Sequence, residues 1–147
     1  INGVKDINDL SNTELWYNDI IFIPLDYTER FFNNLPKIQL KHKVIDPTLY
    51  VTESNELYIF GGRDASNAKN YIQYIDLNVV FQSTSADVLT TMDRFEPMRL
   101  NRVSPLIDTR ILKAGDIYDS CLVIFGGQDF VNNQWIDIEI PPNGLQL

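Results

Sequence analysis

The sequence is poor in the residues that carry most enzyme chemistry. Of its 147 residues, only one is a histidine and one a cysteine. Cys121 has no partner for an internal disulfide, and His42 stands between Lys41 and Lys43, whose positive charges disfavour a bound cation. Covalent catalysis needs a nucleophile with an activating base beside it, and we find no such pair of residues in the sequence. The sequence therefore predicts no catalytic residue, no cofactor and no metal site.

Long hydrophobic runs and a surplus of basic residues are lacking as well. The longest apolar stretches, residues 20–25 and 121–125, are far shorter than the roughly 20 residues that cross a bilayer. The formal net charge of −8 works against nucleic-acid binding, because phosphates require a basic surface. Asn-x-Ser/Thr acceptors are absent, which with the single cysteine suits a reducing compartment. We expect neither a membrane nor a nucleic-acid partner, and a location in the cytoplasm or the nucleus.

The sequence does contain an internal repeat. The run LYIFGG at residues 57–62 recurs as LVIFGG at residues 122–127, and an aspartate follows each copy two residues later. A degenerate third copy ends at Gly3, and the second glycines of the three copies stand 59 and 65 residues apart. Repeats of this size are typical of propellers and other repeat folds. The structural glycines of the repeat are Gly3, Gly61, Gly62, Gly126 and Gly127.

The apolar runs and the glycines make different predictions. Four consecutive apolar residues, at 57–60 and 122–125, are typical of a strand that is covered on both faces. A glycine pair after such a strand allows positive φ angles and a close approach of another backbone. Residues 44–60 predict a hairpin with a turn at 53–56, and residues 103–125 predict a hairpin with a longer loop around 114–116.

Segments after each glycine pair also read as strands. Residues 18–31, 70–81 and 133–142 each begin with asparagine and are rich in Ile, Tyr, Phe or Trp. Phe31 and Phe81, which end the first two, are expected to pack between neighbouring sheets. The best helical candidate is a short insert at residues 83–95, whose β-branched residues weigh against it. The fold class predicted is all-β.

The order of these features resembles the kelch repeat. An apolar run, Gly-Gly, a polar loop, an Asn-aromatic strand and a later aromatic are followed by Pro-Met and Arg within residues 95–102, and more faintly within 35–41. Phe31 and Phe81 depart from the family, which usually carries Trp there. The resemblance covers nearly the whole chain and implies four-stranded antiparallel blades of a β-propeller. A free-standing β-sandwich is the alternative.

This resemblance also implies how the chain is divided. The frame of the glycine runs predicts one partial propeller, an incomplete ring that spans residues 1–147. Its parts are a partial blade at 1–40, a complete blade at 41–98 and a partial blade at 99–147. The remainder of its own propeller is therefore an expected partner.

By the same resemblance, the expected function is that of a protein–protein interaction scaffold or adaptor in a ubiquitin-ligase, polarity, cytoskeletal or signalling assembly. Loops at 4–14, 63–69, 82–94, 113–120 and 128–132 would present partner-binding residues. The candidates are Arg63, Asp64, Arg99, Arg102 and Trp16, since Trp and Arg dominate binding hot spots. The alternative is a part of a galactose-oxidase-like or sugar-isomerase propeller enzyme, for whose copper version His42 alone supplies too few ligands.

Overall fold

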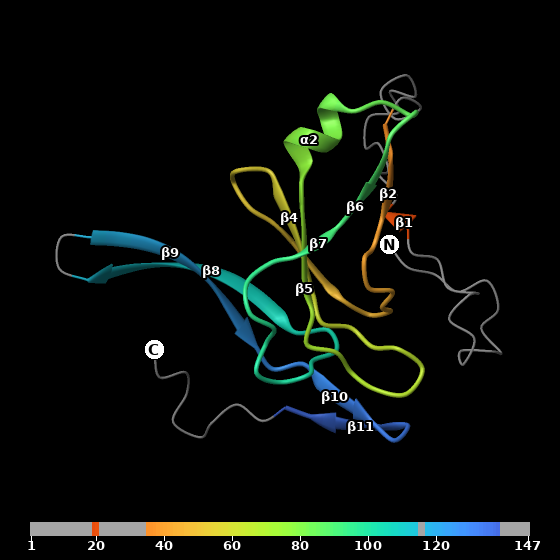
Figure 1. Cartoon of the computed structure of the whole chain (residues 1–147). Coiled ribbons are helices and arrows are strands. Elements are labelled where there is room, and N and C mark those ends of the chain that lie inside the picture. Colours follow the sequence, from red (N-terminus) through yellow and green to blue (C-terminus); the bar gives the residue numbers. More distant parts are fainter. Residues whose placement is uncertain (1–18, 21–34, 115–116, 139–147) are drawn as a thin grey trace, which may run out of the picture.

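A computed structural model describes residues 19–20, 35–114 and 117–138, and the statements below concern these residues. They form several small sheets, almost entirely antiparallel, with one short helix (Figure 1). The all-β prediction is therefore confirmed. None of the sheets closes into a ring within the described ranges. The predictions for Gly3, Trp16 and Phe31 fall outside these ranges.

A four-stranded antiparallel sheet of order β3-β4-β5-β7 stands at the centre of the described structure. Its strands are β3 (Thr48–Val51), β4 (Glu56–Phe60), β5 (Ile72–Asp76) and β7 (Met92–Asp93). Asn55, with a φ of +61°, helps to close the turn between β3 and β4. The hairpin predicted within residues 44–60 is confirmed, and the whole sheet lies inside residues 41–98. We call this sheet with its glycine pair the first unit.

The helix α2 (Leu77–Gln82) corrects the interpretation of residues 70–81 as one strand. β5 ends at Asp76, whose side chain accepts a hydrogen bond from the backbone N–H of Asn78 at 2.8 Å and so caps the helix. β-branched and aromatic residues concealed the helix, because its composition favours strands. Phe81 lies on α2 and is 44% exposed, and its packing between sheets stays a prediction.

The insert at residues 83–95 is not helical. It contains β6 (Val88–Thr90) and then β7. β6 pairs in parallel with β2 (Lys37–Gln39), which pairs antiparallel with β1 (Asp19–Ile20). These three strands form a sheet of order β1-β2-β6, so part of the 41–98 segment reaches into a sheet begun by earlier residues.

Two hairpins follow the central sheet, and we call them together the second unit. They are β8 (Leu106–Ala114) with β9 (Ile117–Phe125), and β10 (Gln128–Val131) with β11 (Gln134–Asp137). The hairpin predicted at 103–125 is confirmed, but the longer loop is wrong because pairing continues to Ala114 and Ile117. The loop predicted at 128–132 is also wrong, since β10 occupies it. Asn132 and Asn133 both have positive φ, as in a two-residue hairpin turn.

The central sheet is covered on both faces. Leu57 and Ile59 pack on one face against residues that include Ile38, Val44 and Val80. Tyr58 and Phe60 pack on the other face with Ile72, Tyr74 and Met98, against Leu122 and Ile124 of β9. The four residues of the apolar run at 57–60 are between 0% and 4% exposed, which confirms the prediction of a strand buried on both faces.

The glycine pairs of both units share one backbone geometry. Gly61 and Gly62 have φ angles of +62° and +90°, and Gly126 and Gly127 have +51° and +85°. A Cβ on Gly62 would lie 2.7 Å from the carbonyl oxygen of Ile45, and a Cβ on Gly127 would lie 2.8 Å from that of Val103. The predicted positive φ and close approach are therefore confirmed at both pairs.

The structural repeat extends further than the sequence comparison found. Ile45 and Val103 each form an isolated bridge to the residue after a glycine pair, Arg63 and Gln128 respectively. Each bridge residue is followed by a residue with positive φ, Asp46 at +54° or Ser104 at +49°, and then by proline. In both units the first strand begins directly after this proline, β3 at Thr48 and β8 at Leu106. The repeated motif is thus aliphatic, polar, proline, then strand.

Candidate functional site

A cleft of about 780 Å³ lies between the central sheet and β9. The turn between β3 and β4 borders one end of it, and Phe60 and Ile72, next to the glycine pair, border the other. Aromatic and aliphatic side chains form most of its wall, with polar groups at the turn. Its lining includes Tyr50, Glu53, Glu56, Tyr58, Phe60, Arg94, Phe95, Cys121, Leu122 and Ile124.

Phe95 is the most unusual residue of this cleft. Its ring is stacked on that of Tyr58 with a centroid separation of 5.9 Å and an interplanar angle of 9°. Phe95 is nevertheless 66% exposed, and its φ is +62°. A bulky side chain in this left-handed region is a genuine outlier. Such strain gathers at ligand clamps and other functional positions, so Phe95 marks the cleft mouth as a candidate binding site.

Charged groups lie beside this aromatic stack. The guanidinium carbon of Arg94 is 4.4 Å from the ring centroid of Tyr74 and 5.6 Å from that of Phe95. Arg94 Nη2 is 3.9 Å from Glu56 Oε1, at the outer limit of an ion pair. Burial, and then the charge of Glu56, raise the pKa of Tyr58 above its usual value, so its phenol stays protonated. The cleft can hold an apolar group against rings while charged groups orient it.

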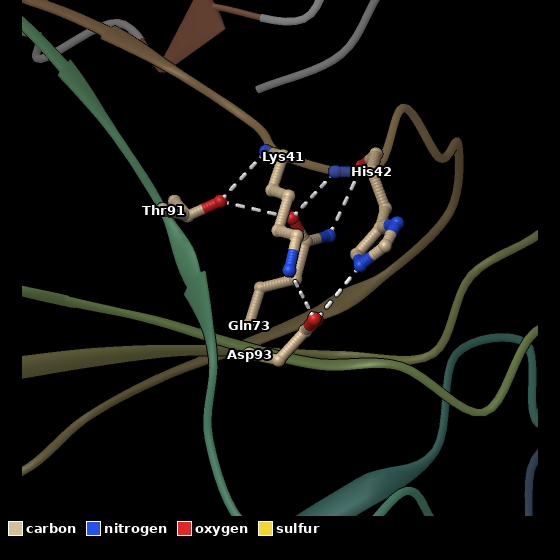
Figure 2. Close-up of polar contacts among 5 residues, drawn as sticks. All are labelled: Lys41, His42, Gln73, Thr91 and Asp93. Carbon is tan, nitrogen blue, oxygen red and sulfur yellow. Dashed lines mark hydrogen bonds and ion pairs between the residues drawn. The ribbon is translucent and has the colours of Figure 1, made fainter.

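A second polar cluster joins the segment after β2 to the central sheet (Figure 2). Gln73 is fully buried at 0% exposure. Its Oε1 accepts hydrogen bonds from the His42 backbone N–H at 3.0 Å and the Thr91 hydroxyl at 2.9 Å, and its Nε2 donates to the His42 carbonyl oxygen at 3.0 Å. Thr91 Oγ1 also accepts from the Lys41 backbone N–H at 2.9 Å. Every bond ties two chain segments together, which indicates a structural role.

Asp93 completes this cluster at the surface. Its carboxylate lies 2.5 Å from Lys41 Nζ and 2.7 Å from His42 Nε2 (Figure 2). Hydrogen bonds from Lys41 and then from His42 lower the pKa of Asp93, although slight burial opposes them. The His42 ring stacks on Tyr71 with centroids 4.1 Å apart. His42 is thus held by a carboxylate and an aromatic ring, which indicates a structural role.

Arg63 and Asp64, two predicted partner-binding residues, take part in packing and in ion pairs. Arg63 is 15% exposed in its side chain, lies 3.1 Å from Asp46, and stands over the rings of Phe130 and Trp135. Asp64 forms an ion pair with Lys69 at 2.6 Å and accepts bonds from two backbone N–H groups. Burial alone would raise the pKa of Asp64, but these hydrogen bonds lower it.

Arg102 joins the two units. Its carbonyl oxygen accepts from the Gly62 N–H at 2.9 Å, and its Nη1 donates to the Gly126 carbonyl oxygen at 3.0 Å. Burial lowers the pKa of the Arg102 guanidinium. Arg99 is exposed and does not line the cleft. None of the four candidates that the structure describes, Arg63, Asp64, Arg99 and Arg102, lines the cleft, and their partner-binding role stays a prediction.

Sequence reasoning missed the cleft residues Arg94 and Phe95. Arg94 was placed only in the loop at 82–94, and Phe95 only at the start of the Pro-Met motif at 95–102. The signal available was an arginine beside an aromatic residue in a loop, which is a common pair at binding surfaces. Gln73 gave a clearer signal, because an amide within a run of buried strand residues needs hydrogen-bond partners.

Two other kinds of site have no support in the described residues. Within the described ranges, no three His, Cys, Asp or Glu side chains are grouped so that they could hold a metal ion. In this part of the chain, no helix has the length and apolar character needed to span a membrane. No family model matches the chain, and neither a curated protein nor a solved structure matches it.

Proposed function

We propose that the chain is part of a kelch-like β-propeller and serves as a scaffold or adaptor that binds other proteins. The observation that carries this proposal is the cleft of about 780 Å³ with the exposed, strained Phe95 at its mouth. Aromatic residues and arginine supply most of the energy of protein interfaces. In this proposal a large apolar side chain of the partner lies on Phe95, and Arg94 and Glu56 orient its polar neighbours.

The scaffold part of the proposal is supported by how the units are built. A four-stranded antiparallel sheet is packed on both faces, and the same glycine geometry occurs twice along the chain. Repeat folds present their partner-binding surfaces on rigid scaffolds of this kind. The site proposed for this chain is a contact surface, and the described residues that line it include no nucleophile with a base beside it.

Affinity capture with matched variants tests this function. The wild-type chain should retain partner proteins from a lysate, and we expect the Phe95→Ala variant to retain at least tenfold less of them. Phe81→Ala is the control, because Phe81 is also an exposed phenylalanine but lies on α2, away from the cleft. Cys121 lines the cleft and is the only cysteine, so bound partner should slow its alkylation. Equal capture by both variants, with unchanged alkylation of Cys121, would contradict the proposed site.

A further inference from the structure

The cleft between the central sheet and β9 is lined by more carboxylates than cations. The charged residues of its lining are Glu53, Glu56 and Arg94. Glu53 is exposed on the turn between β3 and β4 and forms no ion pair with another described residue. Arg94 Nη2 and Glu56 Oε1 are 3.9 Å apart, which is too long for a hydrogen bond. The described part of the chain therefore neutralises these two carboxylates only weakly.

A third carboxylate lies beside Glu56 on the central sheet. Asp76 of β5 is the residue directly opposite Glu56 of β4 in the antiparallel register. Side chains at such positions share a face of the sheet, and like charges there are destabilising. Within the described ranges, Asp76 forms no ion pair either. A cation bound at this end of the cleft would relieve the repulsion between the two carboxylates.

The pKa of Tyr58 agrees with acidic surroundings. Burial raises this pKa most, the negative charge of Glu56 raises it next, and the positive charge of Arg94 lowers it by less. The carboxylate therefore outweighs the guanidinium at the Tyr58 phenol. A negative group of a partner would be repelled by the same carboxylates, whereas a positive group would be attracted.

The aromatic wall of the cleft suits a positive group as well. Tyr50, Tyr58 and Phe95 all line the cleft. A cation within about 6 Å of the centroid of an aromatic ring is attracted by the ring. Arg94 already makes such contacts, at 4.4 Å from the centroid of Tyr74 and 5.6 Å from that of Phe95. Lysine and arginine also pack their methylene stems on apolar surfaces, so a basic side chain can use the rings and the carboxylates together.

We propose that the partner of this cleft is a protein segment that presents a lysine or an arginine beside its large apolar side chain. The charged head of the basic residue binds the carboxylates of Glu53 and Glu56, and its methylene stem lies on the aromatic wall. The formal net charge of −8 also attracts a basic segment from a distance. This inference rests on the proposed function, because it names the chemistry of the partner for the same site.

Defined peptides test the proposal on the full chain. Cys121 lines the cleft and is the only cysteine, so a bound peptide should protect it from alkylation. The probes are a blocked peptide of sequence Gly-Lys-Leu-Lys-Gly and two counterparts that carry glutamine or glutamate in place of both lysines. We expect half-protection by the lysine peptide at a concentration at least fivefold lower than for the glutamine peptide, and the weakest protection by the glutamate peptide.

Two variants show whether the cleft carboxylates are responsible. Glu53→Gln should weaken protection by the lysine peptide at least threefold and leave protection by the glutamine peptide unchanged. Asp87→Asn is the matched control, because it removes the charge of an exposed carboxylate that does not line the cleft. An equal loss in both variants would mean that only the net charge attracts the peptide, and the proposed contact would be wrong.

The remaining outcomes also overturn the proposal. Equal protection by all three peptides, or the strongest protection by the glutamate peptide, would mean that the cleft does not select a basic group, although it would still bind. Protection by none of them would exclude this kind of partner segment. Lysate capture with Phe95→Ala decides separately whether the cleft binds a protein, so the failure of this inference is distinguishable from the failure of the proposed function.

Discussion

The four repeat glycines that the structure describes, Gly61, Gly62, Gly126 and Gly127, should respond differently to alanine, although all four have positive φ. Alanine in the left-handed region costs about 1–2 kcal/mol. The lower entropy of the unfolded variant returns about 0.4–1 kcal/mol of that cost. Among the residues that the structure describes, a Cβ on Gly126 meets no atom within 4 Å, so we expect Gly126→Ala to cause a net destabilisation of about 1 kcal/mol.

Gly61→Ala should cost considerably more. Its Cβ would lie 2.1 Å from the Arg102 carbonyl oxygen, which is a backbone atom and also the acceptor for the Gly62 N–H. Displacing that carbonyl leaves a buried donor unpaired at about 1–3 kcal/mol. The total destabilisation expected for Gly61→Ala is therefore about 2–4 kcal/mol.

Urea denaturation of the chain and its variants measures these values. Gly62→Ala and Gly127→Ala form a matched control pair, because their Cβ atoms would lie 2.7 Å and 2.8 Å from backbone carbonyl oxygens. These two should destabilise the chain to a similar extent, and both more than Gly126→Ala. If Gly126→Ala proves as costly as Gly61→Ala, the difference in neighbours between the two units is not real.

Three further substitutions address the polar cluster and the cleft. Gln73→Leu should lower the free energy of unfolding by about 1–3 kcal/mol, because the His42 backbone N–H and carbonyl lose their partner. An unchanged free energy of unfolding in urea would refute the structural role of these Gln73 hydrogen bonds. Asp93, whose pKa is lowered, stabilises the fold above about pH 3.9, and this contribution is lost as the pH falls through the lowered pKa. The small stability difference between wild type and Asp93→Asn should therefore hold from pH 5 to 7, at about one value, and vanish in acid, and a constant difference at all pH values would contradict this. Phe95→Gly should be at least as stable to heating as Phe95→Ala, since glycine accepts a φ of +62°; a clearly more stable alanine variant would exclude the left-handed backbone.

The features that the sequence predicted well are those with local causes. Four apolar residues before Gly61 indicate a strand covered on both faces, and adjacent glycines indicate a left-handed exit, whatever the neighbours are. The helix α2 was missed because Val79, Val80 and Phe81 have the composition of a strand. Only the Asp76 cap marked its start, and a single aspartate after a strand is equally common in turns.

The candidate site was harder to predict because its parts meet only in the folded chain. Phe95 follows β7, while Cys121 and Leu122 come from β9, and nothing local brings them together. Arg63 and Asp64 were singled out from a loop, yet each already has an ion-pair partner close by, Asp46 for Arg63 and Lys69 for Asp64. Residue type and loop position identify groups that can bind, and tertiary contacts decide which of them are already engaged.

The bond from Gly62 to Arg102 has a consequence for synthesis on the ribosome. The Gly62 N–H is synthesised 40 residues (102 minus 62) before the Arg102 carbonyl that accepts its hydrogen bond. The face of β4 that carries Tyr58 and Phe60 is covered only after β9 has been made. While the residues between Gly62 and the end of β9 are being made, the nascent chain therefore carries one nearly finished sheet that awaits residues still being translated. We expect chains stalled with about residue 100 exposed to be cut by protease near β4, and chains exposed to residue 130 to resist. Equal resistance of both would show that the first unit matures alone.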